Sequence, residues 1–175
     1  GNLMKVFMGK VTYESGKIPV AGKDRQVINE AMTFNDQDYK VTCLSIGNPH
    51  CVIPVPEISK DKACELGKYV ETSDNFPNRI NMQLLKVLDR NNIQIEIFER
   101  GAGYTLASGS SSCAAASAAY KLGLVDHQIT VHMPGGELKI EIQPDETVYM
   151  TGEVSSIGKV VPSQDFICEL ENLKE

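Results

Sequence analysis

Apolar and polar positions alternate along most of this chain of 175 residues, and elsewhere apolar residues follow one another in short runs. β-branched side chains are frequent in these segments and turn-forming residues separate them, which is the pattern of strands bounded by turns. We therefore predict a strand-rich protein. The predicted strands cover residues 3–8, 26–34, 39–46, 51–55, 79–88, 93–99, 129–133, 138–142, 148–154 and 165–169.

Two segments between predicted strands have the chemistry of hairpin turns. They are Asp-Arg-Asn-Asn at 89–92 and Pro-Gly-Gly at 134–136. Asn and Gly tolerate the positive φ angles that tight turns need. We therefore expect the strands on either side of each turn to be antiparallel neighbours.

Residues 59–70 have the pattern of an amphipathic helix. Ser59 is a candidate N-cap, and helical spacing places Ala63, Leu66 and Val70 on one face. We expect this helix to cover the sheet with that face.

Residues 110–122 predict a second helix of a different kind. Its side chains are small on all sides, Lys121 is its one charged residue, and Gly123 is suited to end it. Because this helix has no polar face, we expect it to be buried on all sides. Its many alanines suit a helix threaded through a curled sheet.

Composition and charge place the chain among ordinary globular proteins. Hydrophobic residues make up 42% and charged residues 23%, and the length suits one domain that buries roughly 70% of its unfolded surface. The formal net charge is -6, without a cluster of Lys and Arg, which argues against a nucleic-acid surface. We also expect neither export nor membrane insertion, since the chain has no signal-like start and no apolar run near the ~20 residues that span a bilayer.

The cysteines indicate neither a zinc site nor a complete disulfide set, because their number is odd and no CxxC or CxxxH spacing occurs. We therefore expect no metal, free thiols in a reducing cytosol and a cytoplasmic protein. The first strand is already in progress at Leu3, which fits a fragment of a longer protein. The five cysteines are Cys43, Cys51, Cys64, Cys113 and Cys168.

Candidate chemistry gathers where a strand ends in Glu99 and Arg100 and a glycine loop leads into the buried helix. A helix N-terminus has unpaired N–H groups and a positive dipole end, so Gly109 and Ser110 are predicted to bind a carboxylate. Ser108 would face that anion. Alternatively, Ser108 or Ser110 is only an N-cap, and Glu99 and Arg100 form only a surface ion pair.

Four segments, taken in order, resemble the signatures of diaminopimelate epimerase. They are GNPHCV at 47–52, FPNRIN at 76–81, ERGAG at 99–103 and YMTG at 149–152. That family has two similar domains, each a β-barrel around a central helix, with the active site in the cleft between them. The resemblance implies an α+β fold, a barrel of mostly antiparallel strands around a buried central helix. It also implies that residues 1–175 form a single domain, the C-terminal half of a two-domain protein.

The resemblance implies a cofactor-independent amino-acid racemase or epimerase of lysine biosynthesis, without metal or pyridoxal phosphate. Inversion at Cα needs a base on one face and an acid on the other, and oriented donors must stabilise the developing negative charge. The family uses two cysteines, one from each domain. The expected partners are therefore an amino-acid substrate and the N-terminal domain of the same protein, with a homodimer left open.

The resemblance also implies residue roles. The family positions that hold the polar groups of the substrate match Asn48, Asn81, Glu99 and Arg100, and those that bind its α-carboxylate match Gly109 and Ser110. The catalytic positions match Ser108, Glu99 and His50, of which His50 and Glu99 tune the thiols. Outside this context, the local pattern indicates a turn residue at His50 and a solvent-facing strand residue at Asn81.

The chain departs from the family pattern at several positions. Ser108 stands where a catalytic cysteine is expected, Tyr104 replaces a usual Glu, Ser111 a usual Gly and Glu153 a common Pro. A serine hydroxyl is a far weaker acid than a thiol and needs an adjacent base. Ser108 therefore marks an engineered trap, a paralogue or a protein that only binds, and the joint changes favour the paralogue. Tyr104 is expected near the mouth of the site, where it would alter the accepted substrate.

Two further functions remain open from the sequence. Glu99 could shift a double bond by acid/base work, which would make the protein another kind of isomerase, or the domain could bind without catalysis. We expect the isolated half to be inactive, because it lacks the opposing face. Cys113 lies more than one turn into the buried helix and is predicted to pack there.

Overall fold

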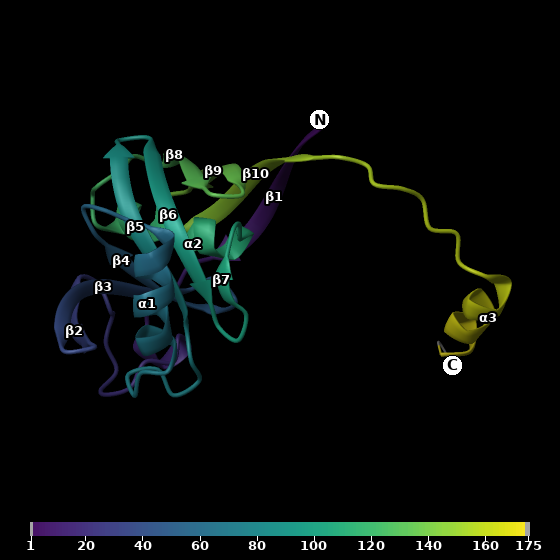
Figure 1. The fold of residues 1–175 in the computed structure, drawn as a ribbon. Helices are drawn as coiled ribbons and strands as arrows, with labels where there is room; N and C mark the ends of the chain where they lie inside the picture. Colours follow the sequence, from purple (N-terminus) through teal and green to yellow (C-terminus); the bar gives the residue numbers. More distant parts are fainter. Residues whose placement is uncertain (1, 174–175) are drawn as a thin grey trace.

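A strongly curled sheet carries one helix on each of its faces and a third helix on a C-terminal tail (Figure 1). This arrangement comes from a computed structural model, which describes residues 2–173. The helices are α1 (Lys60–Glu71), α2 (Gly109–Lys121), α3 (Gln164–Asn172) and the short 3-10 helix η1 (Ser15–Lys17). The strands are β1 (Asn2–Lys10), β2 (Glu30–Phe34), β3 (Gln37–Ser45), β4 (Pro49–Pro54), β5 (Asn81–Asp89), β6 (Asn92–Glu99), β7 (Gly103–Thr105), β8 (Gln128–Met133), β9 (Gly136–Ile142) and β10 (Thr147–Val154).

The strands pair in the order β1-β10-β9-β8-β6-β5-β4-β3-β2, and β7 adds to β6. Two of these pairings, β4 with β5 and β6 with β8, are parallel, and the others are antiparallel. The predicted α+β class is therefore confirmed, and so are the hairpins at 89–92 and 134–136, which join β5 to β6 and β8 to β9.

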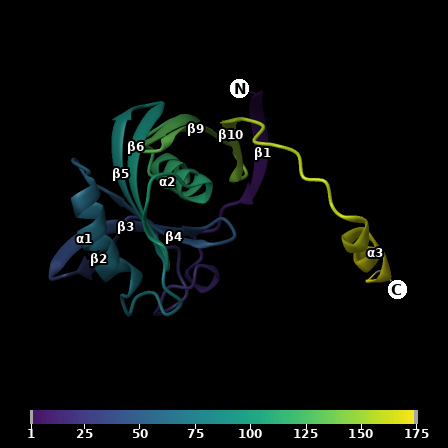
Figure 2. The same cartoon turned by 45° about the vertical axis from the view of Figure 1, so that its right-hand side comes forward.

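The expected closed barrel is not confirmed, because the order of strands has two ends, β1 and β2. The sheet instead curls around α2 (Figure 2). One isolated bridge, between Thr12 and Ser45, joins the chain after β1 to β3 through N–H···O bonds of 3.0 and 2.9 Å. The two ends of the sheet are thus joined near one point by this bridge, but no continuous ladder of hydrogen bonds closes the sheet.

Helix α2 lies on the concave face and contacts strands β3, β4, β5, β6, β8, β9 and β10. Nine of its residues are buried, among them Cys113 and a run of alanines. Small side chains let the helix backbone approach the surrounding strands closely, so a helix of this composition fits inside a sheet with a tight curl. Gly123, with φ of 71°, follows the helix in the left-handed conformation that was predicted to end it.

Helix α1 covers the opposite face, where it contacts β5, β6 and β7. Ser59 is its N-cap, as predicted, and its Oγ accepts a hydrogen bond from Lys62 N at 3.2 Å. The predicted apolar face is also confirmed, since Ala63, Leu66 and Val70 are buried. Each face of the sheet therefore has its own apolar core, one around α2 and one beneath α1.

The predicted strand at 165–169 is wrong, because this segment belongs to α3. Ser163 caps the helix by accepting a hydrogen bond from Phe166 N at 3.3 Å, and Asp165 lies in the first turn. Both features favour a helix start. The apolar residues Phe166, Leu170 and Leu173 recur at helical spacing rather than at the alternate spacing of a strand.

The predicted strand at 26–34 begins too early. Asn29 adopts a φ of 51°, which turns the chain out of extended geometry, and β2 starts only at Glu30. Gln26 keeps a single bridge to Glu14. Asn accepts this conformation more readily than other residues, so the strand pattern is interrupted there.

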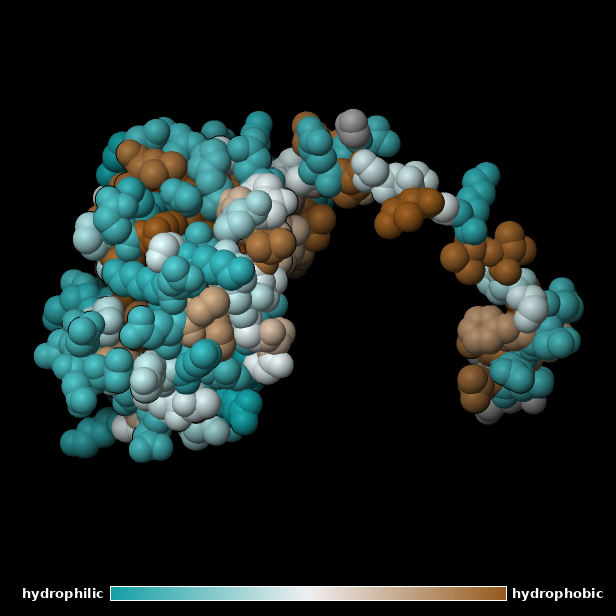
Figure 3. All heavy atoms as spheres, in the orientation of Figure 1, coloured by the Kyte–Doolittle hydropathy of each residue, from teal (hydrophilic) through white to brown (hydrophobic). Residues whose placement is uncertain are grey.

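The tail leads away from the sheet, and α3 has no buried residues within the described part of the chain (Figure 1). Apolar side chains remain visible along it (Figure 3). The most exposed of them are Ile157, Val160, Val161 and Leu173. Between residues 2 and 173, no helix has the length and apolar character needed to cross a membrane.

Gly67→Ala tests how closely α1 packs on the sheet. A Cβ at this position would lie 2.6 Å from Phe98 Cβ, so we expect the substitution to lower the free energy of unfolding by about 2 kcal/mol. Chemical denaturation measures the change. Gly158→Ala is the control, since this glycine is exposed and an added Cβ would meet no atom within 4 Å, so its effect should stay within about 0.5 kcal/mol. Equal stability of the two variants would contradict the packing argument.

Candidate functional site

The N-terminus of α2 begins at Ser108, which is its N-cap. Ser108 has extended backbone angles, φ -155° and ψ 126°, and its Oγ accepts a long hydrogen bond of 3.5 Å from Ser111 N. Its carbonyl oxygen accepts from Ser112 N at 3.0 Å and from Ser112 Oγ at 2.8 Å. The N-cap interpretation is therefore correct for Ser108. It does not exclude a chemical role, because Ser108 is only half-buried and lines a cavity.

Gly109 allows β10 to pack against the first turn of α2. A Cβ at Gly109 would lie 3.0 Å from Met150 Sδ and 3.3 Å from Met150 Cε, which is a crowded distance. Met150 belongs to the segment 149–152 that resembles a family signature. One family-like segment, far from α2 in the sequence, thus packs against the N-terminus of this helix.

An open cavity of about 710 Å³ lies beside this N-terminus. Ser108 and Gly109 form one side of it, and the hairpin of β8 and β9 together with β10 forms much of the rest. None of the other predicted site residues lines this cavity. The full set of lining residues is Leu3, Ala107, Ser108, Gly109, Met133, Gly135, Gly136, Glu137, Leu138, Lys139, Thr151, Gly152 and Glu153.

Asn48 and His50 reach the same helix end from the β3–β4 turn and from β4. Asn48 Nδ2 donates to Ser110 Oγ at 3.3 Å, and His50 Nε2 lies 2.9 Å from Asn48 Oδ1. Because Asn48 Oδ1 can only accept, His50 carries its proton on Nε2 in this arrangement. His50 is fully buried in strand β4, so its interpretation as a turn residue is wrong.

Burial lowers the pKa of His50 from 6.5 to about 4. The Gln83 side chain partly opposes this shift, and the positive charge of Arg100 adds to it. Within this protein, His50 is therefore a neutral imidazole at neutral pH.

Asn81 begins β5 beside His50, with which it is paired in the parallel ladder. It is 6% exposed, so its interpretation as a solvent-facing residue is wrong. Its Nδ2 donates to Pro49 O at 2.8 Å, and its Oδ1 accepts from Arg100 N at 2.9 Å. Asn81 thus ties the start of β4 to the loop after β6, and direct contact with a substrate stays a prediction.

Glu99 and Arg100 stand at the end of β6 and make separate contacts. Glu99 Oε2 accepts from Thr105 Oγ1 at 3.2 Å, whereas the exposed Arg100 donates from one guanidinium nitrogen to Asn78 O at 3.0 Å. Among the ion pairs of residues 2–173, none joins the two side chains. The alternative of a surface ion pair between them is therefore not observed.

Two buried polar residues next to the site were not predicted from the sequence. Gln83 is fully buried in β5, and its Nε2 donates to Ser111 Oγ at 3.1 Å. Glu71, at the end of α1, accepts from Gly101 N at 2.8 Å. The sequence signals were weak: Gln83 interrupts an apolar strand, and Glu71 follows directly after the buried Val70 of α1.

Tyr104 does not lie near the mouth of the site, so that expectation is wrong. Its hydroxyl donates to Glu96 Oε2 at 2.6 Å, the Lys60 amino group lies 5.3 Å from its ring centre, and its ring packs on the core beneath α1. Burial and the Glu96 carboxylate raise the pKa of Tyr104 to about 12. Cys113, in contrast, is fully buried in the core around α2, where burial raises its pKa to about 12.

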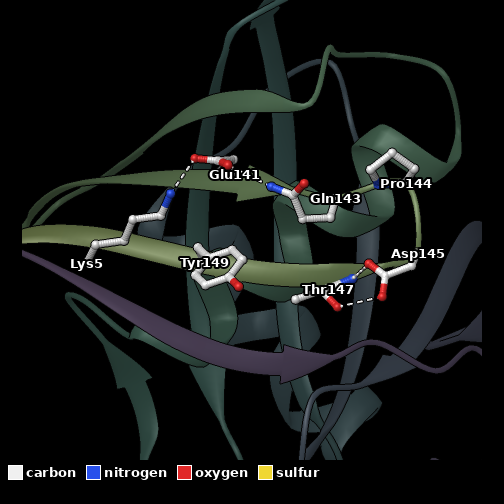
Figure 4. A pocket seen from close by; sticks show the side chains of 7 residues that line it. All are labelled: Lys5, Glu141, Gln143, Pro144, Asp145, Thr147 and Tyr149. Atoms are coloured by element: carbon white, nitrogen blue, oxygen red, sulfur yellow. Dashed lines mark hydrogen bonds and ion pairs between the residues drawn. The ribbon is translucent and has the colours of Figure 1, made fainter.

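A second hollow, on the outer side of β9 and β10, contains no predicted site residue (Figure 4). Its polar groups pair with one another: Lys5 Nζ lies 2.7 Å from Glu141 Oε2, and Thr147 Oγ1 donates to Asp145 Oδ2 at 3.0 Å. Residues 2–173 contain no group of three His, Cys, Asp or Glu placed to hold a metal ion.

Comparisons with known proteins agree with the four sequence segments. The model of the family described as diaminopimelate epimerase matches residues 42–157. Diaminopimelate epimerase 2 from Nostoc sp. is 50% identical over 159 residues, which are 91% of this chain and 56% of that protein. Diaminopimelate epimerase from Moorella thermoacetica is 39% identical over 85% of this chain and 54% of its own length. The chain thus spans about half the length of these relatives.

The fold is also found in a solved structure of low sequence identity. A hydroxyproline epimerase from Agrobacterium vitis superposes with a TM-score of 0.63 at 10% identity, and the match covers 90% of this chain and 52% of that chain. At this identity the match shows the fold alone. The arrangement of a curled sheet around a helix therefore recurs among proteins of very different sequence.

The pH dependence of stability tests the state of His50. Its imidazole takes up a proton near pH 6.5 in the unfolded chain but only near pH 4 in the folded one. The free energy of unfolding should therefore fall as the pH drops from about 6.5 to 4, by on the order of 3 kcal/mol, and chemical denaturation measures it. In His50→Gln this part of the slope should disappear, whereas His127→Gln, which removes an exposed imidazole, should keep it. An NMR titration midpoint of His50 near 6.5 would contradict the assignment.

Proposed function

Because this chain belongs to the diaminopimelate epimerase family, we propose that the complete protein is a cofactor-independent epimerase or racemase that inverts the Cα of an amino acid. Diaminopimelate is the first candidate substrate, in keeping with the names of the relatives. The observation that carries the proposal is the half-buried N-terminus of α2, where Ser108 faces a cavity and Ser110 is tied to the pair Asn48 and His50.

The proposed carboxylate site consists of the first turn of α2. The N–H groups of Gly109 and Ser110 lie in the first turn and have no carbonyl acceptor one turn earlier in the helix, and the positive end of the helix dipole favours an anion there. A substrate carboxylate bound at this turn would have its Cα close to Ser108. As the proton leaves Cα, negative charge develops on the carboxylate, and the same N–H groups stabilise it.

We place Ser108 on one face of Cα and a group from the missing half of the protein on the other. One group accepts the Cα proton and the other returns a proton to the opposite face, so the configuration inverts. An alcohol is a weak acid and a poor base, so a cysteine on the other side would be the stronger partner. Ser108 then marks a paralogue whose substrate and rate differ from those of two-cysteine relatives.

The neighbouring polar groups have proposed roles that follow from the family resemblance. His50 and Glu99 tune the reacting groups, and Asn48, Asn81 and Arg100 hold the polar groups of the substrate. The guanidinium of Arg100 is exposed and offers a planar fork that suits a carboxylate. Neutral His50 adds no positive charge at the helix tip, so the anion is held by N–H groups and by Arg100.

We further propose that residues 1–175 are a single domain, the C-terminal half of a two-domain enzyme, with a sheet that forms a barrel around α2 in the complete protein. The match of this chain to about half of each relative supports this division. The isolated half would be inactive, because it provides one face of the cleft. A homodimer of the complete protein would leave this division unchanged.

Two other functions make different predictions for the same site. A double-bond isomerase would use the half-buried Glu99, whose carboxylate is held by Thr105, as the group that moves a proton. A binding domain would hold the amino acid without chemistry. Deuterium uptake at Cα separates the three functions.

The complete two-domain protein, incubated with diaminopimelate in heavy water, should incorporate deuterium at Cα with loss of stereochemistry. Mass spectrometry measures the uptake, and chiral chromatography measures the configuration. Uptake with retained configuration would favour the double-bond isomerase, and absence of uptake with bound ligand would favour the binding domain. The 175-residue chain alone should show no uptake.

Ser108→Cys should raise the rate of this exchange by about tenfold or more, because a thiol is the stronger acid/base group at a helix N-terminus. Ser108→Ala should lower it. Ser59→Cys is the matched control, since Ser59 caps α1 on the other face of the sheet and its replacement should leave the rate unchanged. An equal or lower rate for Ser108→Cys would place Ser108 outside the line of the reaction.

A further inference from the structure

Glu71 is a buried carboxylate that lies outside all four family-like segments. It is the last residue of α1, and only 12% of its side chain is exposed. Burial of a carboxylate is unfavourable unless strong hydrogen bonds compensate for the lost water. The partners of Glu71 therefore indicate what the residue does.

Glu71 Oε1 accepts a hydrogen bond of 2.8 Å from Gly101 N. Arg79, its second partner, lies farther away at 3.4 Å and has a side chain that is 60% exposed. Solvent screens an ion pair of this kind, so it contributes little. The bond from Gly101 N is charge-assisted and short, and it is the dominant contact of this carboxylate.

Gly101 follows Arg100 in the loop after β6 and has a φ of 76°, which few other residues adopt readily. Two consecutive N–H groups of this loop are held by side chains, that of Arg100 by Asn81 and that of Gly101 by Glu71. The Arg100 guanidinium also donates to Asn78 O. The direction of the Arg100 side chain is thus set by contacts from the segment between α1 and β5.

These contacts continue to the helix N-terminus. Asn81 donates to Pro49 O, the neighbouring Asn48 donates to Ser110 Oγ, and Ser110 is in the first turn of α2. A path of side-chain hydrogen bonds and adjacent backbone therefore runs from the end of α1 to the start of α2. Arg100 lies on this path between the two helices.

We infer that Glu71 is a positioning residue: its carboxylate holds the Gly101 amide and so fixes Arg100 relative to the N-terminus of α2. This inference deepens the proposed function and rests on it where it assigns Arg100 to substrate binding. Reach matters more than charge, because the hydrogen bond to Gly101 N needs an acceptor atom at the length of a glutamate side chain.

Two conservative variants of the complete two-domain protein separate reach from charge. Glu71→Gln keeps an acceptor oxygen at the same distance and loses the charge, whereas Glu71→Asp keeps the charge and is one methylene too short. Arg79→Gln is the control, since it removes the exposed partner of Glu71 only. Amide hydrogen exchange at Gly101, followed by NMR, and the KM and kcat of Cα exchange are measured for each.

Glu71→Asp should speed Gly101 amide exchange and raise KM by about tenfold, the order of effect of one hydrogen bond to a charged group, with a smaller change in kcat. Glu71→Gln and Arg79→Gln should stay within about threefold of the wild type in KM. If Glu71→Gln raises KM as much as Glu71→Asp does, then the charge of Glu71, and not the position of its acceptor atom, is what the site requires. If Glu71→Asp leaves Gly101 exchange unchanged, Glu71 does not hold the loop.

If the proposed epimerase function is wrong, the measurements give a different set of results. The wild-type protein would then show no Cα exchange at all, while amide exchange at Gly101 in the Asp and Gln variants would still decide whether Glu71 fixes the loop. Faster amide exchange in Glu71→Asp without any change in KM or kcat would overturn the positioning role for catalysis.

Discussion

The packing of α2 inside the curled sheet is the constraint on which the rest of the structure depends. A helix can approach seven strands only if its side chains are small, and nine buried residues of this helix meet that demand. Such a helix has no polar face to turn toward water, so the unpaired backbone N–H and C=O groups at its two ends must find hydrogen-bond partners at the rim of the sheet. The half-buried first turn at Ser108 to Ser110 is the consequence.

Polar side chains around that turn are paired in a way that limits their freedom. His50 and Gln83 are both fully buried, and each uses part of its hydrogen-bonding capacity toward the α2 end, His50 through Asn48 and Gln83 directly to Ser111. His50 Nδ1 and Gln83 Oε1 have no partner among the described residues. A buried polar atom without a hydrogen-bond partner is costly. The first turn of α2 is thus tied to the β3–β4 turn by Asn48 and to β5 by Gln83.

The sequence predicted most elements and much of the site for physical reasons. Alternation indicated most of the strands, and the alanine-rich helix was recognised because its composition is unusual. The errors had two causes: Asn29 turns the chain inside an apparent strand, and the N-cap and helical spacing of the α3 segment were overlooked. Closure of the sheet depends on pairing between distant segments, such as Thr12 with Ser45, which periodicity does not contain.

In the site, the residues that lie in the family-like segments or directly before the helix were predicted, and two buried polar residues outside them were missed. Ser108 was recognised because it directly precedes a helix. Glu71 and Gln83 meet their partners 30 and 28 positions later, so their own surroundings indicated them only weakly. Tyr104 was placed on the wrong side because a strand turns successive side chains to opposite faces, and it follows the face of Glu96 and Phe98 toward α1.

The hydrogen bond between Gln83 and Ser111 makes substitutions at these two positions depend on each other during evolution. With glycine at 111, the buried amide of Gln83 would lose its acceptor, and with an apolar residue at 83, the Ser111 hydroxyl would have to find another partner. Either single step passes through a less stable intermediate. A lineage that gained serine at 111 would therefore be expected to change both positions nearly together, and position 83 should be compared alongside 108 and 111 when paralogues are distinguished.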